Sequence, residues 1–122
     1  MRRGAAAVAA FAITAALAGP AVAHAMLEHA NPPVGSTVAA APSALTLRFT
    51  QQLEPAFSGV TVTDAAGRRV DLGNAVVPPG HAEELQVRLK PLAAGRYTVR
   101  WHAVSVDTHR TEGNFTFTVA GR

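Results

Sequence analysis

Three residues near opposite ends of the chain carry the donor atoms that transition metals prefer. His24 follows a candidate cleavage site, and Asp107 and His109 are separated by a single residue. If His24 becomes the first residue of a mature chain, its free α-amine and its imidazole Nδ1 can close a chelate ring on one metal ion. Both groups release their protons near neutral pH, and metal binding favours that release. Asp107 and His109 project to the same side of an extended chain, so an oxygen and a nitrogen can converge there.

This set of three nitrogens and one oxygen predicts a copper site. Tetragonal sites made of nitrogen and oxygen favour Cu(II), which also has the highest affinity among the divalent first-row ions. The chain contains no Cys, which excludes thiolate metal sites, iron–sulfur clusters and disulfides. A plainer interpretation exists for each element, because a terminal His is often frayed and an Asp-x-His loop is often only solvated.

Residues 1–23 have the pattern of a secretory signal peptide. Arg2 and Arg3 provide the positive start, residues 5–18 are almost wholly apolar, and residues 21–23 match an A-x-A cleavage site. The apolar stretch is short for a membrane span, which needs roughly 20 residues. The segment therefore predicts export, with an uncleaved membrane anchor as the alternative.

Cleavage after Ala23 would leave residues 24–122 as one mature domain in the periplasm. The cut removes two of the 11 basic residues and none of the 8 acidic ones, which lowers the formal charge from +3 to +1. The remaining Arg residues are scattered, so nucleic acid is excluded as a partner. A second A-x-A site ends at Ala25, and cleavage there would remove His24.

Short runs of alternating apolar and polar residues recur after residue 23 and predict antiparallel strands with one buried face. They cover residues 45–49, 60–63, 70–72, 85–89, 97–102 and 115–119. Turn sequences separate these runs, and six or seven strands in about 100 residues predict an all-β, immunoglobulin-like sandwich. Tyr97 follows a Gly turn and resembles the tyrosine corner of such folds, and Trp101 is expected to anchor the core.

The sequence around Asp107 and His109 resembles a known family. Residues 97–109 read Y-T-V-R-W-H-A-V-S-V-D-T-H and are followed by G-N-F-T-F at 113–117. This is similar to the Y-x-V-x-W-x-x-x-S-x-D-x-H…G-x-F-x-F signature of the CopC-type periplasmic copper-resistance proteins. Residues 24–36 resemble the family's H-x-x-L…P-x-x-G-S opening, and residues 47–49 and 57–59 resemble its L-x-F-S and F-S-G segments. The resemblance covers the whole mature chain.

The resemblance implies a seven-stranded Greek-key β-sandwich that binds copper and is not an enzyme. It implies one Cu(II) ion per chain, with His24, Asp107 and His109 as the ligands. The implied role is copper resistance or homeostasis, in which the protein sequesters copper or passes it to an inner-membrane transporter of the CopD type. We expect the chain to be a monomer.

The chain departs from the family pattern at several positions. Some members bind Cu(I) in a Met-rich stretch, whereas Met1 and Met26 are the only methionines here, so we expect no such Cu(I) site. Thr50 replaces the Ser of the L-x-F-S segment. Gln51 and Gln52 stand where some members have an acidic residue.

Three questions are open at this level. His29, five residues after His24, either joins the site or is an exposed strand residue. A small copper oxidase with a histidine brace is one alternative function, although the chain is small and Asp107 would occupy a position that oxygen chemistry needs. A metal-free β-sandwich that binds another protein is the other alternative.

Overall fold

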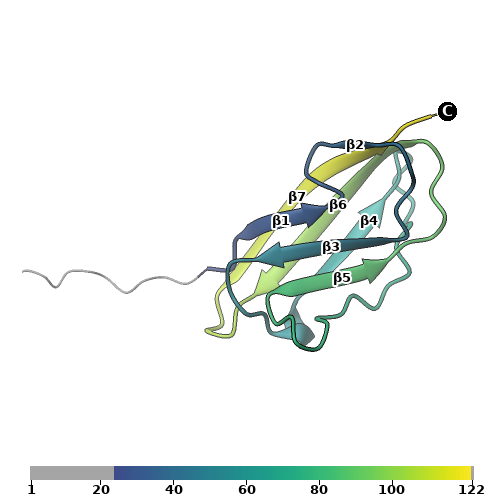
Figure 1. Ribbon diagram of the computed structural model, residues 1–122. Helices are drawn as coiled ribbons and strands as arrows, with labels where there is room; N and C mark the ends of the chain where they lie inside the picture. Colours follow the sequence, from purple (N-terminus) through teal and green to yellow (C-terminus); the bar gives the residue numbers. More distant parts are fainter. Residues whose placement is uncertain (1–23, 122) are drawn as a thin grey trace, which may run out of the picture.

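Alternating apolar and polar residues build the strands of this domain, which Figure 1 shows as a computed structural model. The structure describes residues 24–121, so the expected signal peptide at 1–23 lies outside the described residues. Residues 24–121 form seven strands and one short 3₁₀ helix. These are β1 (Leu27–Asn31), β2 (Thr37–Val38), β3 (Ala44–Phe49), η2 (Pro55–Phe57), β4 (Gly59–Thr63), β5 (Glu84–Arg88), β6 (Gly95–Val104) and β7 (Arg110–Val119).

The strands form two sheets that pack face to face (Figure 1). One sheet has the order β1-β3-β5 and the other has the order β2-β7-β6-β4. The named strands pair antiparallel, except that β2 lies parallel to β7. This arrangement confirms the predicted all-β, immunoglobulin-like sandwich. Within residues 24–121, no helix is long and apolar enough to cross a membrane.

The core lies between the sheets and is made by the inward-facing residues of each strand. Its members include Leu45, Leu47, Phe49, Val60, Val62, Leu85, Val87, Val99, Trp101, Phe115 and Phe117. Trp101 meets Phe49 of the opposite sheet edge to face, with ring centroids 5.1 Å apart, which confirms it as a core anchor. The Tyr97 hydroxyl donates to the Ala93 carbonyl at 2.6 Å, which confirms the tyrosine corner.

The strand predicted at residues 70–72 is wrong. Asp71 makes only an isolated bridge to Leu89, and Leu72 is exposed. The buried residue of this run is Asp71, whose side chain is fully covered. It is held by the Arg69 guanidinium and by the Val62 backbone N–H. The alternation predicted that Val70 and Leu72 would be buried and that Asp71 would be exposed. A carboxylate that accepts this many hydrogen bonds can be buried instead.

Three segments that are distant in the sequence meet at one end of the sandwich. Figure 1 shows the start of the described chain, the end of β3 and the turn between β6 and β7 at this end. The long β6–β7 hairpin places that turn at the edge of the domain, because its two strands pair from Gly95–Val119 to Val104–Arg110. The fold therefore brings residue 24 beside the Asp-x-His segment.

Candidate metal centre

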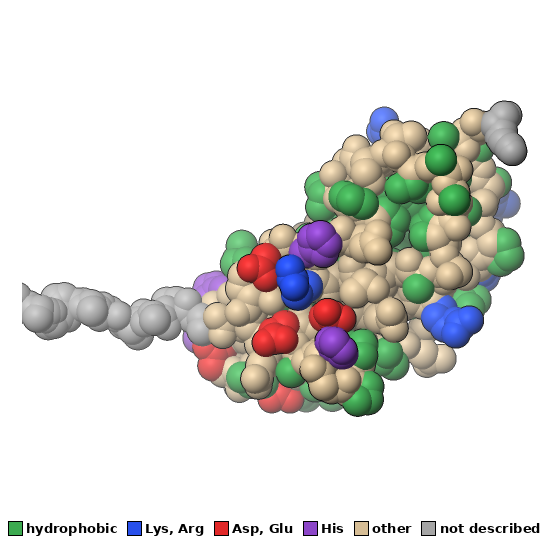
Figure 2. All heavy atoms as spheres, in the orientation of Figure 1, with side chains coloured by type: hydrophobic (Ala, Val, Ile, Leu, Met, Phe, Trp, Pro, Cys, Tyr) green, Lys and Arg blue, Asp and Glu red, His purple; other side chains and the backbone are tan. Residues whose placement is uncertain are grey.

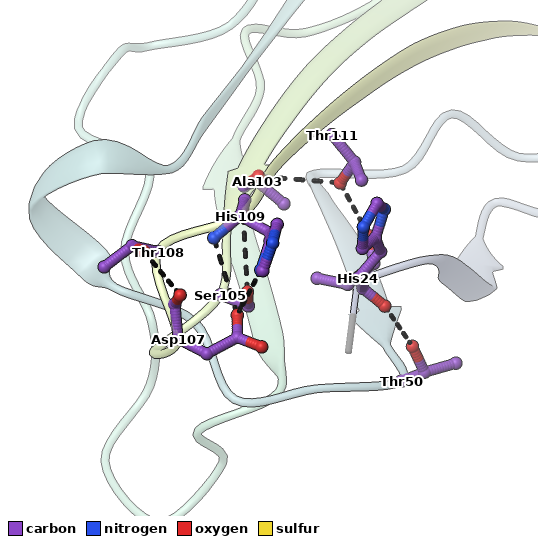
Figure 3. Close-up of polar contacts among 9 residues, drawn as sticks. His24, Thr50, Ala103, Ser105, Asp107, Thr108, His109 and Thr111 are labelled. Carbon is purple, nitrogen blue, oxygen red and sulfur yellow. Dashed lines mark hydrogen bonds and ion pairs between the residues drawn. The ribbon is translucent and has the colours of Figure 1, made fainter. Parts of the chain in front are cut away.

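The imidazoles of His24 and His109 face each other at this end of the domain (Figure 3). Their ring centroids are 4.9 Å apart, and the ring planes differ by 21°. Two nitrogens that each bind one ion at ~2.0 Å lie about 3–4 Å apart. A rotation of the side chains would therefore allow one nitrogen from each ring to bind the same ion.

The turn between β6 and β7 fixes the Asp-x-His segment. The Ser105 N–H donates to the His109 carbonyl at 2.9 Å, and the Thr108 N–H donates to the Ser105 carbonyl at 2.7 Å. Thr108 has φ 74°, in the left-handed region that a β-branched residue rarely adopts. These contacts reverse the chain over a few residues and leave Asp107 and His109 at the tip.

Asp107 and His109 are brought together by this turn. Oδ1 of Asp107 lies 3.3 Å from Nδ1 of His109. Two donors that bind one ion at ~2.0 Å lie between about 2.8 Å apart at right angles and about 4 Å apart on opposite sides, and this pair falls within that range. Both side chains are accessible, at 51% for His109 and 40% for Asp107.

The charge of Asp107 is favoured by its neighbours. The buried Ser105 hydroxyl donates to Oδ1 of Asp107. This hydrogen bond, with those from the His109 side chain and backbone, outweighs partial desolvation and lowers the pKa of Asp107 below its ordinary value. The side chain is therefore a carboxylate at neutral pH, which is the form that binds a metal ion.

The described residues contain only part of the predicted donor set. Within residues 24–121, no group of three or more His, Asp or Glu side chains is arranged to hold a metal ion by itself. His24 contacts His109, and His109 contacts Asp107. The fourth predicted donor is the α-amine of His24, and it exists only after cleavage between Ala23 and His24. The completeness of the site therefore depends on processing.

The segment that carries His24 is anchored to both sheets. Ala25 is completely buried. Its carbonyl accepts a hydrogen bond from the Thr111 hydroxyl at 2.6 Å, and the Met26 N–H donates to the Thr50 hydroxyl at 3.0 Å. Figure 3 shows Thr50 and Thr111 on either side of His24. The backbone that carries His24 is therefore held by both sheets.

Sequence reasoning missed three hydroxyl residues around the site, namely Ser105, Thr50 and Thr111. Ser105 lies within the S-x-D-x-H block, so its spacing from Asp107 was available as a signal. Thr50 occupies the Ser position of the L-x-F-S segment and keeps a hydroxyl there. No sequence pattern marked Thr111, because its partner Ala25 is brought to it by the fold.

His29 does not lie with His24 and His109. It pairs with Arg48 of β3, and a bulge shifts the register between Leu27 and His29. Since Leu47 and Phe49 point into the core, Arg48 and His29 lie on the outer face of the β1-β3-β5 sheet. Figure 2 shows acidic, basic and His side chains gathered on this face.

His81 and His102 also lie apart from the site. His81 is in the loop before β5, with Nδ1 3.7 Å from Oε2 of Glu84. His102 is on the outer face of β6, where its ring lies over Gly59. Burial, aided by the charge of Arg110 and opposed by that of Glu112, lowers the pKa of His102.

The whole domain is similar to known proteins. The family model described as "CopC domain" matches residues 27–120. Protein YobA of Escherichia coli (strain K12) is 41% identical over 113 residues, covering 88% of each chain. Copper resistance protein C of Escherichia coli is 39% identical over 106 residues, covering 81% of this chain and 83% of the relative.

A solved structure agrees with these sequence relationships. The crystal structure of CopC from Methylosinus trichosporium OB3b has a TM-score of 0.76 and 34% identity, covering 81% of this chain and 96% of that one. The family model spans both strands of the β6–β7 hairpin and the Asp-x-His turn between them. The chain therefore belongs to the CopC domain family.

Proposed function

We propose that the mature protein binds one Cu(II) ion at the end of the sandwich. The ligands are the α-amine and imidazole of His24, the imidazole of His109 and the carboxylate of Asp107. The observation that carries this proposal is the stacking of His24 on His109, 4.9 Å apart, with Asp107 3.3 Å from the second ring. The two His residues come from opposite ends of the domain, so no local sequence preference accounts for their contact.

The donor set supports Cu(II) over Cu(I). Imidazole, amine and carboxylate suit Cu(II), whereas Cu(I) prefers thiolate and thioether sulfur. The sequence has no Cys, and Met26 is its only methionine after the expected signal peptide. One ion per chain follows from a single pair of facing imidazoles, because His29, His81 and His102 lie elsewhere.

The role we propose is copper resistance or homeostasis in the periplasm. Relatives are named copper resistance protein C, and the expected signal peptide at 1–23 would export the domain. The proposed ligands Asp107 and His109 are both solvent accessible, so a partner can approach a bound ion directly. We propose that the monomer sequesters copper or passes it to an inner-membrane transporter of the CopD type.

Anchoring of the N-terminal segment supports cleavage after Ala23. Cleavage after Ala25 would remove a residue that is fully buried and whose carbonyl accepts a hydrogen bond from Thr111. It would also remove His24. The cut after Ala23 keeps both residues and creates the α-amine, so the mature domain is residues 24–122.

The proposal is tested on protein secreted with its own signal and purified without metal. Intact mass gives the first residue, and titration with Cu(II) followed by electron paramagnetic resonance gives stoichiometry and ligand type. We expect His24 as the first residue, one Cu(II) per chain and nitrogen hyperfine structure. An all-oxygen signature would contradict the ligand set, and no binding would favour the metal-free interaction module.

A further inference from the structure

Two threonine hydroxyls hold the backbone immediately beside His24. The Thr50 hydroxyl accepts from the Met26 N–H at 3.0 Å and lies 3.2 Å from the His24 carbonyl, to which it donates. The Thr111 hydroxyl donates to the Ala25 carbonyl at 2.6 Å. A hydroxyl has one donor and two acceptor positions, so all three bonds are made at once.

The two threonines come from different sheets. Thr50 directly follows β3 of the three-stranded sheet, and its backbone N–H donates to the Met26 carbonyl at 2.9 Å. Thr111 is the second residue of β7 in the four-stranded sheet, two residues after His109. The segment is thus fixed relative to both sheets, and Thr111 ties it to the strand that carries His109.

We propose that Thr50 and Thr111 are positioning residues for the copper site. They hold residues 24–26 so that the amine and ring of His24 face His109 before the ion arrives. This inference rests on the proposed function, because it assigns the two hydroxyls a role in presenting the His24 chelate.

The physical reason is conformational entropy. The first residues of a domain are poorly ordered unless they are tied down. A ligand on a free terminus would have to be ordered when copper binds, which weakens binding. In this fold the segment becomes ordered when the protein folds and not when copper binds, because Ala25 is completely buried and its carbonyl already accepts a hydrogen bond.

Thr111→Val removes the hydroxyl with little change in shape, and Thr111→Ser keeps the hydroxyl. Thr116→Val is the matched control, because Thr116 is a half-buried residue of the same strand that pairs with Thr98. Each variant is made as processed protein starting at His24. A second set carries one extra residue before His24, which converts the α-amine to an amide.

Copper affinity is measured by competition against a calibrated chelator. In processed protein we expect Thr111→Val to weaken Cu(II) binding roughly fivefold, as the loss of one hydrogen bond would, and Thr50→Val to act in the same direction. Thr111→Ser is expected to restore most of the affinity, and Thr116→Val to leave it unchanged. In the extended set, Thr111→Val should have a smaller effect, because only the ring of His24 is left for it to position.

Backbone order in the copper-free protein gives a second readout. We expect the Ala25 and Met26 amides to have NMR order parameters near the rigid value of ~0.85 in the parent, and clearly lower values in Thr111→Val. Melting temperature of each copper-free variant shows whether the fold persists. If Thr111→Val does not fold, the Thr50→Val and Thr111→Ser measurements carry the test.

The outcomes separate the inference from the function on which it rests. If processed and extended parent proteins bind Cu(II) equally, the His24 chelate is wrong and the positioning role fails with it. If the processed parent binds more tightly but Thr111→Val and Thr50→Val match it in affinity and order, the proposed function stands and the positioning role is overturned. A loss of affinity in Thr111→Val without any loss of order at the Ala25 and Met26 amides would also overturn it, because the hydroxyl would then not act by ordering this segment.

Discussion

The imidazole rings of His24 and His109 stack 4.9 Å apart, joining the start of the domain to the tip of its longest hairpin. Local structure alone does not bring the two residues together. His24 depends on the anchored segment before β1, and His109 depends on the left-handed turn at Thr108. The proposed copper site therefore depends on how the two sheets pack against each other.

The proposed ligands differ in how much their loss should weaken copper binding. His109→Ala removes a nitrogen donor and should lower Cu(II) affinity by roughly 100-fold or more, which exceeds the usual effect of losing a residue behind a ligand. Asp107→Asn keeps an oxygen and removes only the charge, so its effect should be smaller. His29→Ala, on the outer sheet face, is the control and should bind like the parent. Competition titration ranks the variants, and a loss in His29→Ala equal to that in His109→Ala would refute the assignment.

The Asp71 carboxylate should stabilise the domain at neutral pH, and this stabilisation should be lost in acid. Burial alone would raise the pKa of Asp71, but hydrogen bonds from Arg69 and from the Val62 and Gly73 N–H groups outweigh it and lower the pKa. A lowered folded pKa stabilises the protein above the unfolded value of ~3.9, and this stabilisation is lost as pH falls through the folded pKa. Asp71→Asn should therefore destabilise the domain by about 2 kcal/mol at pH 7, with a smaller difference from the parent near pH 2.

Urea unfolding at both pH values measures this effect. Glu112→Gln is the matched control, because both side chains of the Arg110–Glu112 ion pair are exposed. A difference between Asp71→Asn and the parent that is as large at pH 2 as at pH 7 would show that the charge is not responsible.

Gly113 should tolerate no side chain without a structural shift. A Cβ at this position would lie 2.7 Å from Cζ2 of Trp101, inside van der Waals contact with a buried ring. Gly113→Ala should lower stability by about 1–3 kcal/mol, the usual range for overpacking. Gly121→Ala is the control, because its Cβ would make an ordinary contact of 3.7 Å with Ala94. Thermal unfolding compares the two variants, and equal melting temperatures would contradict the close approach.

Bound copper should not act as an oxidase. In the proposed set Asp107 takes a coordination position that oxygen chemistry requires to be open. With ascorbate and oxygen, the copper-loaded protein should produce less hydrogen peroxide than the same concentration of free Cu(II). Sustained peroxide production above that of free Cu(II) would instead favour the histidine-brace oxidase.

Much of the fold could be predicted from alternation because inward and outward residues differ in most strands. β3, β4, β6 and β7 each contain a predicted run, and β5 contains all but the last residue of the run at 85–89. β1 could not be found this way, because the bulge between Leu27 and His29 breaks its period. The run at 70–72 misled the prediction because a buried carboxylate there is satisfied by Arg69 and backbone N–H groups.

The candidate site could be predicted only in its donor types. His24, Asp107 and His109 stand out because of their chemistry and spacing, and the structure brings them together in pairs. The contacts of Thr50 and Thr111 could not be predicted, because backbone carbonyls and N–H groups look alike in every sequence. Their partners are determined by the approach of two sheets, which no local pattern encodes.

The central claim is that the free α-amine of His24 is a copper ligand, and one comparison tests it directly. Cu(II) affinity is measured by chelator competition for protein starting at His24 and for protein with one additional residue before it. No side chain of the domain differs between the two, and the His24→Ala variant of each form serves as the control. We predict that the extension weakens binding by more than the roughly 10- to 100-fold expected for a residue behind a ligand, and that its effect is smaller in His24→Ala, where the amine has no ring with which to close a chelate. Equal affinity of the processed and extended parent proteins would contradict the account.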